Sequence, residues 1–334
     1  MTKRFKKILV TGGAGFICSE FVRQAIDRKY QIVVVDKLSY AGDLARLKDI
    51  KGKFQFCKTD IADKKALFRI LQKEKIPAVV HFAAESHVDR SILDASDFIR
   101  TNVEGTQCLL QACQQAGIEK FIHLSTDEVY GEIEKGAFRE DSPLKPNSPY
   151  SASKAAADFF VQAFIRTYQF PAVILRPSNN YGPGQYPEKF IPVIIYKALR
   201  NEKVPVYAHG ENIREWLHIA DCSRAVMTAL ERGKVGEAYN IGSGNERKNI
   251  HVVKAILKIL NKPEELIAFV QDRPGHDLRY ALNFNKIQHE LGWRPQIDFE
   301  SGLPLTVAWY QKNFRWLESK VKFLHNYWKQ VYKF

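Results

Sequence analysis

The first half of the chain alternates short β-branched runs with stretches of helical periodicity, and this alternation limits the fold more than any other feature. The predicted strands cover residues 7–11, 31–36, 54–58, 78–82 and 120–125. Between them, residues 17–28, 64–73 and 104–116 carry apolar side chains at three- and four-residue spacing, which is typical of helices. Strands separated by helices form βαβ units with right-handed crossovers. The sequence therefore predicts an α/β fold with a Rossmann-type, doubly wound parallel sheet.

The second half predicts a smaller α/β lobe. A helix over 150–168 and a strand over 171–176 are followed by Gly- and Pro-rich loops, with predicted strands at 204–207 and 238–241 and a helix at 252–260. We expect a Rossmann domain over residues 1–178, to which some later segments return, a C-terminal substrate-binding lobe over 179–318, and a basic aromatic tail over 319–334. With no internal repeat or evident linker, the two lobes are expected to share a cleft.

Composition indicates a globular protein. The 334 residues are 45% hydrophobic and 26% charged, which suits a substantial core. No apolar run approaches the roughly 20 residues needed to cross a bilayer, and the N-terminus leads into a strand, not into the apolar segment of a signal peptide. The five cysteines lack zinc-ligand spacing and indicate free thiols in a reducing compartment. We therefore expect a cytoplasmic protein with no metal site and no integral membrane segment.

The net charge of +13 suggests an anionic partner, either nucleic acid or a small anion such as a nucleotide diphosphate. A solvated basic surface is the plainer alternative, since part of the excess lies at the ends, in residues 3–7 and from Lys312 onward. No nucleic-acid-binding signature accompanies the charge. The sequence therefore favours the small anion and predicts no nucleic-acid partner.

A glycine-rich loop, Thr11-Gly12-Gly13-Ala14-Gly15-Phe16-Ile17-Cys18, follows the first predicted strand and opens a helix. Glycines let backbone N–H groups approach a pyrophosphate at the helix N-terminus. Asp36 ends the second predicted strand, where it can bind ribose hydroxyls and repel the extra phosphate of NADP. The combination predicts an NAD site, with Asp60 and Ile61 at the adenine ring. The alternative is that Asp36 or Asp60 only caps a helix or stabilises a turn. Cys18 replaces the usual third glycine, and we interpret it as a tolerated small residue.

Two further motifs carry chemistry. Tyr150 and Lys154 lie four apart on one predicted helix face, where an ammonium lowers the pKa of a phenol so that the phenolate can take a hydroxyl proton during hydride transfer. Thr126, Asp127 and Glu128 follow the last of the five predicted strands. Adjacent carboxyl groups serve as acid and base when their surroundings separate their pKa values. These five residues are the predicted catalytic set. The alternatives are that Tyr150 and Lys154 lie on an ordinary surface helix and that residues 126–128 only cap the end of a strand.

With these motifs the chain, from about residue 7 to about 314, resembles the extended short-chain dehydrogenase/reductase family and, within it, the nucleoside-diphosphate-glucose 4,6-dehydratases. The segments that carry the resemblance are Asp36-Lys37-Leu38-Ser39-Tyr40-Ala41-Gly42, His81-Phe82-Ala83-Ala84-Glu85-Ser86-His87-Val88-Asp89-Arg90-Ser91, Ser125-Thr126-Asp127-Glu128-Val129-Tyr130-Gly131, Ser178-Asn179-Asn180-Tyr181-Gly182-Pro183 and Asp272-Arg273-Pro274-Gly275-His276-Asp277. The Asp127-Glu128 pair discriminates best, because epimerases and decarboxylases of this fold differ there.

The resemblance implies an NAD-dependent hydro-lyase with internal redox chemistry. Tyr150 removes the proton of the sugar 4-hydroxyl as NAD takes the C4 hydride, and Thr126 hydrogen-bonds the 4-oxygen. Glu128 then abstracts the C5 proton that the new ketone acidifies, protonated Asp127 releases the C6 hydroxyl as water, and the hydride returns to C6. The implied product is a 4-keto-6-deoxy sugar.

The resemblance also implies the binding residues and a homodimer formed through a four-helix interface that includes the helix after Tyr150. The expected cofactor residues are Gly12, Gly15, Phe16, Ile17, Asp36, Lys37, Leu38, Ser39, Asp60, Ile61, Phe82, Ala83, Ala84, Ser86, Thr101, Tyr150, Lys154 and Asn180. The expected substrate residues are Ser86, Thr126, Asn179, Lys189, Phe190, Pro205, Val206, Tyr207, Arg214, Asn240, Asp272, Arg273 and His276. The implied substrate is a nucleotide sugar, dTDP-glucose or UDP-glucose.

Several alternatives stay open at this point. Glu215 and Ala208-His209 differ from the residues most common at these positions of the substrate loops in the family. The identity of the nucleotide base therefore stays more open than the reaction. An NAD-dependent nucleotide-sugar 4-epimerase or decarboxylase is the nearest rival, and a non-catalytic NAD-sensing or nucleic-acid-binding protein is a rival of another class. In the tail, Val321, Leu324, Trp328 and Val331 stand at helical spacing among lysines. The tail could pack on its own core or a partner subunit, or lie on an anionic membrane surface.

Overall fold

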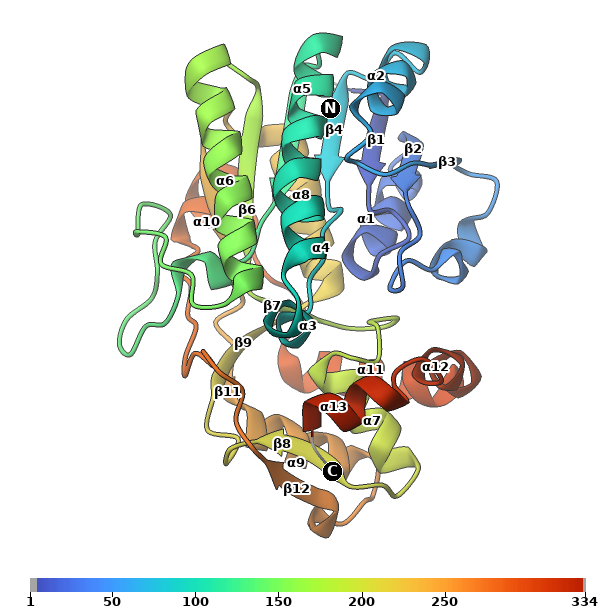
Figure 1. Ribbon diagram of the computed structural model, residues 1–334, viewed down its shortest axis with the longest axis vertical. Helices are drawn as coiled ribbons and strands as arrows, with labels where there is room; N and C mark the ends of the chain where they lie inside the picture. The colour runs from blue at the N-terminus through green and yellow to red at the C-terminus, as the bar shows by residue number, and fades with distance from the viewer. Residues whose placement is uncertain (1–4, 333–334) are drawn as a thin grey trace.

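The computed structural model describes residues 5–332, in two lobes stacked along the long axis of the molecule (Figure 1). Lys3 and Arg4 of the basic N-terminal stretch and the last two residues of the tail lie outside this range. The upper lobe is built on one large sheet, and the lower lobe on two small ones. Of the helices over the described residues, none is both long and apolar enough to cross a membrane.

The large sheet has seven strands, all parallel, in the order β10-β6-β5-β4-β1-β2-β3. Its strands are β1 Lys7–Thr11, β2 Gln31–Asp36, β3 Gln55–Lys58, β4 Ala78–His81, β5 Lys120–Leu124, β6 Ala172–Pro177 and β10 Ala238–Ile241. The strand order reverses between β1 and β4, which is where doubly wound sheets open a ligand crevice at their carboxyl ends. This arrangement confirms the predicted Rossmann-type fold.

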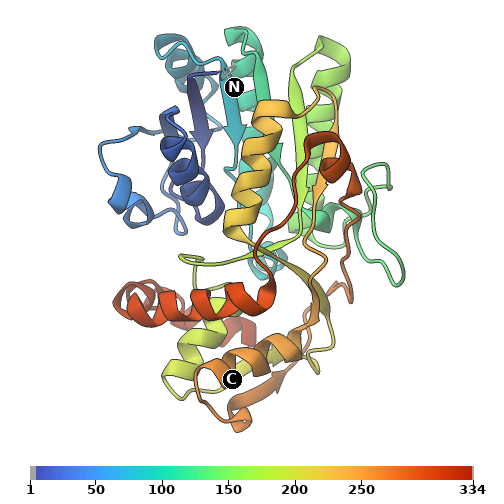
Figure 2. The same ribbon diagram turned by 180° about the vertical axis from the view of Figure 1, so that it is seen from behind.

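Helices cover both faces of the sheet, which explains why its central strands are apolar on both sides. One face packs against α1 Phe16–Asp27, α8 Ile219–Arg232 and α10 Asn285–Leu291. The other face packs against α2 Lys64–Lys73, α5 Thr106–Ala116 and α6 Pro149–Tyr168. Figure 1 shows α2, α5 and α6 in front of the sheet, and Figure 2 shows the yellow α8 on the back. The core of the upper lobe therefore lies in two layers, one on each side of the sheet.

Loops and short helices extend the carboxyl edge of this sheet. They are η1 Leu44–Ile50, α3 Val88–Leu93, α4 Ser96–Phe98, the π-helical segment η2 Ile99–Gly105 and η3 Asp127–Tyr130. The α4 and η2 segments run on into α5, so the helix predicted over 104–116 begins earlier than its apolar pattern indicates. At Gly105 an added Cβ would lie 2.8 Å from the Ile61 side chain, so a larger residue there would require Ile61 to move.

Over the described residues the lower lobe combines a three-stranded sheet, β11-β9-β7, with a parallel pair, β12-β8, five α-helices and one 3-10 helix. Its strands are β7 Asn179–Tyr181, β8 Val204–Tyr207, β9 Ile213–His218, β11 Glu246–Lys248 and β12 Ile267–Val270, and its helical segments are α7 Phe190–Leu199, α9 Asn249–Ile259, η4 Glu264–Leu266, α11 Phe299–Lys312, α12 Phe314–Val321 and α13 His325–Tyr332. One hydrophobic core joins these elements. Strand β10 and helices α8 and α10 lie after residue 178 in the sequence, but they belong to the upper lobe, where they join or cover the large sheet.

The tail packs on the protein's own core. Val321, Leu324 and Trp328 are buried in the core of the lower lobe, and Val331 is half-buried against it. The sequence left three options for the tail, namely its own core, a partner subunit or a membrane surface. Over the described part of the tail, the structure shows packing on the protein's own core. Figure 1 shows α13 on the side of the lower lobe that faces the upper lobe.

Candidate active site

A cavity of about 380 Å³ runs along the carboxyl edge of the large sheet and between the two lobes. Most of the residues predicted from the sequence line it: Gly12, Gly15, Phe16, Ile17, Asp36, Lys37, Ser39, Ile61, Phe82, Ala83, Ala84, Ser86, Thr101, Thr126, Asp127, Glu128, Tyr150, Lys154, Asn179, Asn180, Lys189, Phe190, Tyr207, Arg214, Arg273 and His276. Leu38, Asp60, Pro205, Val206, Asn240 and Asp272 lie outside its lining. Residues from distant parts of the chain thus share one cavity of the size that small-molecule sites have.

The glycine-rich loop crosses the end of β1 close to the loop after β4. Gly12 has φ of +69°, and an added Cβ there would lie 2.7 Å from the Cα of Ala83, so only a glycine fits. Gly15 precedes α1, and no side chain caps this helix N-terminus. Its free N–H groups and the helix dipole make a suitable seat for a pyrophosphate.

Asp36 holds the loops around it by backbone hydrogen bonds. Its Oδ2 accepts from the Ala14 N–H at 2.9 Å, and its Oδ1 accepts from the Leu38 N–H at 2.7 Å. Burial raises the pKa of the carboxyl group, and these two hydrogen bonds oppose the rise. A buried carboxylate therefore stands at the end of β2, beside the glycine-rich loop, where a dinucleotide's ribose would lie.

Cys18 is buried in the core between α1 and the sheet. Burial, with a smaller contribution from Asp36, raises the pKa of its thiol well above the usual value. The thiolate is the reactive form of cysteine, so this thiol is inert at neutral pH. The sulfur fills space in the core, in keeping with a tolerated small residue.

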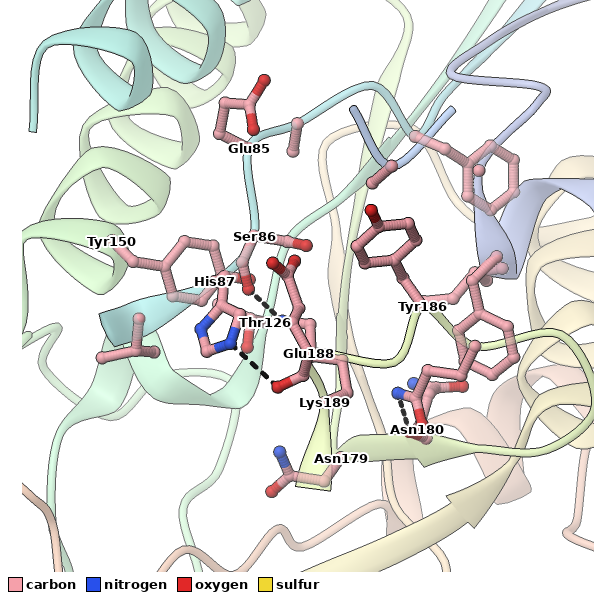
Figure 3. Close-up of a pocket in the computed structure, with 18 of the residues that line it drawn as sticks. Glu85, Ser86, His87, Thr126, Tyr150, Asn179, Asn180, Tyr186, Glu188 and Lys189 are labelled. Atoms are coloured by element: carbon pink, nitrogen blue, oxygen red, sulfur yellow. Dashed lines mark hydrogen bonds between the residues drawn. The ribbon is translucent and has the colours of Figure 1, made fainter. Parts of the chain in front are cut away.

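The Thr126-Asp127-Glu128 segment forms the turn that leaves β5. Thr126 is the N-cap of η3, where its Oγ1 accepts from the Glu128 N–H at 3.3 Å and donates to Asp127 Oδ1 at 3.2 Å. Tyr150 stands in the first turn of α6, whose start is fixed by a capping box between Ser148 and Ser151. Figure 3 shows the Tyr150 ring reaching from α6 toward Ser86 and Thr126.

The two adjacent carboxyl groups have different surroundings. Asp127 is 2% exposed, and its Oδ2 has no hydrogen-bond partner among residues 5–332. Burial raises its pKa well above the usual value, and the charges of Glu128 and Glu215 raise it further. Burial also raises the pKa of Glu128, but Arg273, Arg214 and Lys189 act against this rise. The surroundings therefore raise the pKa of Asp127 more strongly than that of Glu128, a separation that an acid and a base require.

The pKa of Tyr150 is raised in this structure, chiefly by burial and then by the charge of Glu128. This direction is opposite to the lowering by Lys154 that the sequence predicts. The reason is that burial dominates, and the Lys154 Nζ is engaged elsewhere, since it donates at 2.7 Å to the carbonyl oxygen of Leu124. Thr126 opposes the rise through a hydrogen bond to the Tyr150 side chain.

A buried ion pair between Asp158 and Arg176 lies next to the site. Asp158 stands one turn after Lys154 on α6, and its Oδ2 accepts from Arg176 Nε at 2.9 Å while its Oδ1 lies 3.3 Å from His123 Nε2. Hydrogen bonding and these positive charges outweigh burial and lower the pKa of Asp158 to about 2. Burial lowers the pKa of Lys154 to about 8, and the Asp158 charge limits that shift.

Basic side chains gather at the far end of the cavity. The Arg214 guanidinium donates to the carbonyl oxygens of Ile213 and Asp277, each at 2.8 Å, and lies over the Tyr280 ring at 4.3 Å. Lys189 donates to the carbonyl oxygen of Ser86, as Figure 3 shows. With Arg273, these groups form a cationic region suited to a diphosphate.

Some predicted substrate residues have other partners. Val206 is buried in the core of the lower lobe. The Asn240 side chain accepts from Tyr130 Oη at 2.8 Å and donates to the Phe138 carbonyl oxygen at 3.0 Å. Asp272 is exposed, and its Oδ1 lies 2.6 Å from His276 Nδ1. Contacts of these residues with a substrate stay predictions.

Other residues of the lining were not predicted. Asp89 accepts from Tyr207 Oη at 3.1 Å and pairs with Arg273 at 3.3 Å. It belongs to the segment that carried the resemblance, so a signal for it was present. Tyr332, from α13, also lines the cavity, and no local motif marks it. The sequence shows that the tail is amphipathic, but it does not show what the tail touches.

The chain is similar to known proteins over almost its whole length. The profile of the GDP-mannose 4,6-dehydratase family matches residues 9–306. A dTDP-glucose 4,6-dehydratase of Xanthomonas campestris pv. campestris is 48% identical, with 93% of this chain and 94% of the relative covered. A dTDP-glucose 4,6-dehydratase of Neisseria gonorrhoeae is 49% identical, with 93% and 97% covered.

Solved structures give the same picture. A dTDP-glucose 4,6-dehydratase of Streptomyces venezuelae, solved with NAD bound, has a TM-score of 0.92 at 47% identity and covers 94% of this chain and 99% of its own. A UDP-glucose 4-epimerase of Thermotoga maritima has a TM-score of 0.87 at 32% identity, with 92% and 99% covered. These comparisons confirm the resemblance that the motifs indicated. The chain belongs to the GDP-mannose 4,6-dehydratase family, within the extended short-chain dehydrogenases/reductases.

Proposed function

We propose that the protein is an NAD-dependent dTDP-glucose 4,6-dehydratase, which converts dTDP-glucose to dTDP-4-keto-6-deoxyglucose and water. The observation that carries the proposal is the pairing of a buried Asp127 with Glu128 in the cavity that also holds Tyr150 and Lys154. The relatives that are dTDP-glucose 4,6-dehydratases support this choice of reaction and nucleotide.

The cofactor is NAD, held by the cofactor residues predicted above. The uncapped N-terminus of α1 and the close approach of Gly12 to Ala83 fit a dinucleotide. The Asp36 carboxylate suits ribose hydroxyls and would repel a 2′-phosphate, so NAD is preferred over NADP. When bound, NAD accepts the hydride from C4 of the sugar and returns it to C6, so that no cofactor is consumed.

Tyr150 is the base for the sugar 4-hydroxyl. Burial and the nearby carboxylates hold the phenol in its protonated form in the chain by itself. The Thr126 hydroxyl, which contacts the Tyr150 side chain, acts in the opposite direction, and its proton would turn from Asp127 to the sugar 4-oxygen when substrate binds. The phenol must first release its own proton, which becomes favourable when positive charge nearby outweighs burial, and the Lys154 ammonium contributes to that charge. The resulting phenolate then takes the proton of the sugar 4-hydroxyl.

Glu128 and Asp127 perform the elimination. Burial raises the pKa of Glu128, and Arg273, Arg214 and Lys189 act against this rise, so Glu128 is the better base of the pair and removes the C5 proton. Asp127 keeps its proton because it is buried beside two acidic residues, and it protonates the departing C6 hydroxyl. Arg214, Arg273 and Lys189 bind the diphosphate, and Tyr207 stacks on the nucleobase.

Product analysis tests the proposed reaction. The enzyme is incubated with dTDP-glucose, UDP-glucose, GDP-mannose, dTDP-galactose and UDP-glucuronic acid, and the products are separated by chromatography and measured by mass spectrometry. We expect loss of one water from dTDP-glucose, faster than from the other nucleotides. If only UDP-glucose lost water, the substrate would be UDP-glucose and not dTDP-glucose. Formation of an epimer of unchanged mass would show an epimerase. Loss of carbon dioxide from a uronic-acid sugar nucleotide would show a decarboxylase.

The two lobes divide the work in this proposal. Residues 1–178, with the later segments that return to the large sheet, bind NAD, and residues 179–318 bind mainly the nucleotide sugar. We also propose a cytoplasmic location, since five cysteines without a disulfide among the described residues suit a reducing compartment. Proteinase protection in fractionated cells would test the location.

We further propose a homodimer formed through α6 and the neighbouring helix. Phe159 and Tyr168 on α6 expose 55% and 53% of their surface, and Ile99 in η2 exposes 59%. Exposed apolar side chains on adjacent helices are a common feature of subunit interfaces. Sedimentation should show a dimer for the wild type and a monomer for Phe159→Glu, whereas the exposed control Lys329→Glu should stay dimeric.

A further inference from the structure

Helix α13 lies after the part of the chain that the family profile matches, which ends at residue 306. It is held firmly in the lower lobe. Leu324 is buried just before it, and the Trp328 ring contacts the Tyr196 ring at 5.7 Å with the Lys197 ammonium 5.0 Å from its centre. The position of the end of α13 is therefore defined by packing.

A second set of contacts ties α13 to the upper lobe. The Arg90 guanidinium of α3 lies between two rings, 4.1 Å from the centre of Tyr40 and 4.3 Å from that of Tyr327. Arg90 Nε donates to Glu188 at 2.7 Å. Both lobes thus hold the helix, and its last described turn stays at the cavity between them.

That last turn carries Tyr332 into the wall of the cavity. Its ring lies 5.8 Å from the ring of Tyr207, at 49°, and the ring is buried. On another side of Tyr207 stands His276, with ring centres 5.7 Å apart. Arg273 lies 6.0 Å from the centre of the Tyr207 ring. Aromatic rings and cations therefore meet at this end of the cavity.

Such a pairing matches a nucleoside diphosphate, whose base is a flat ring and whose phosphates are anionic. Rings bind rings through their faces and edges, and arginines bind the phosphates. We infer that Tyr332 is a nucleobase-contacting residue, which completes with Tyr207 the aromatic end of the substrate site. This inference rests on the proposed function, because a sugar nucleotide is the ligand. It makes the C-terminal helix part of the binding site.

Calorimetry with two ligands tests the inference on the full-length protein. dTDP carries a base and a diphosphate, whereas inorganic pyrophosphate carries only the charge. Tyr332→Ala should bind dTDP about ten-fold more weakly, the range that loss of one ring contact with a base produces, and should bind pyrophosphate as the wild type does. Tyr332→Phe keeps the ring and should bind both ligands within about two-fold of the wild type.

Two further variants separate contact from packing. Tyr332→Leu fills space without an aromatic ring and should also lose affinity for dTDP but not for pyrophosphate. Gln330→Ala, on the exposed side of the same helix, should behave as the wild type. In turnover of dTDP-glucose, Tyr332→Ala should raise KM about ten-fold and leave kcat nearly unchanged, as expected for lost uniform binding.

Equal dTDP affinity in Tyr332→Ala, Tyr332→Leu and the wild type would overturn the inference. An equal loss of dTDP and pyrophosphate affinity would also overturn it, because that result would show a structural effect on the whole site. Failure of the proposed function gives a different result. In that case the wild type does not dehydrate dTDP-glucose, yet dTDP binding still depends on the Tyr332 ring.

Discussion

The Lys154 Nζ donates a hydrogen bond of 2.7 Å to the carbonyl oxygen of Leu124, the last residue of β5. This bond joins the helix that carries Tyr150 to the strand that leads into Thr126, Asp127 and Glu128. The two motifs are 20 or more residues apart in the chain, but one buried ammonium fixes their separation in space. Lys154 therefore positions the catalytic groups as well as contributing charge.

Tyr150→Phe should block the first oxidation, because the ring stays in place and the proton acceptor is lost. We expect kcat to fall by about 10²–10⁴ or more, as for other positioned acid–base groups. In a single-turnover experiment no reduced nicotinamide should form, while the NAD content of the purified variant stays at the wild-type level. Oxidation at the wild-type rate would show that another group accepts the proton.

Glu128→Gln should permit oxidation at C4 and stop removal of the C5 proton. In D2O the wild type should place deuterium at C5, and the variant should not. Product formation should fall by about 10²–10⁴. Full dehydration by this variant would mean that Glu128 is not the base.

Asp127→Asn should act one step later. The base remains, so exchange of the C5 proton with D2O should continue, whereas expulsion of water from C6 should slow by about 10²–10⁴ because the proton donor is gone. The ratio of C5 exchange to water loss, measured by mass spectrometry, should therefore rise. A parallel loss of both would indicate that Asp127 supports the structure of the turn.

Lys154 should make stability depend on pH in a defined direction. Its pKa is about 8 in the folded chain, below the ordinary value of 10.5, so at lower pH the buried charge is a cost to folding. Between these values the folded chain releases the proton while the unfolded chain retains it, so the wild type gains stability as pH rises. At 1.36 kcal/mol per unit, the gain is about 3 kcal/mol in full.

Urea unfolding at pH about 7.5 and about 9.5 measures this effect against Lys154→Met. The unfolding free energy of the wild type should increase relative to that of Lys154→Met when the pH is raised. Lys329→Met, which removes an exposed lysine, should show no such shift relative to the wild type. A constant difference between the wild type and Lys154→Met would contradict the assigned pKa.

Asp158→Asn should destabilise the protein by about 3–5 kcal/mol, because it leaves the buried Arg176 without its charge partner. Chemical denaturation measures the loss. The double variant Asp158→Asn/Arg176→Met should be less destabilised than the single changes added together, since neither charge remains unpaired. In the wild type this contribution should fade as pH falls from about 3.8 toward about 2, the ordinary and the folded pKa of Asp158.

Much of the upper lobe could be predicted because its signals are local. The apolar runs that became β1, β2, β4 and β5 are buried on both faces, so their composition alone marks them. The helix α8 was not predicted, although it covers the same sheet. It follows β9 in a stretch of short elements and loops, and it returns to the first lobe through contacts that no local pattern records.

The catalytic residues were predictable by type and spacing, whereas their electrostatics were not. Burial and the neighbouring charges separate Asp127 from Glu128, and the same burial raises the pKa of Tyr150 against the predicted direction. These shifts depend on how much water the folded chain excludes, which is a property of three-dimensional packing.

By itself the sequence determined the parallel sheet, the glycine-rich loop and the identity of the reacting groups, because each depends on neighbours in the chain. Only the tertiary structure decided that the Lys154 ammonium reaches Leu124, that Asn240 bonds to Tyr130, and that Tyr332 closes the cavity beside Tyr207. The reason is that long-range contacts arise from the packing of whole elements, and the packing of α13 against both lobes is recorded in no single stretch of residues.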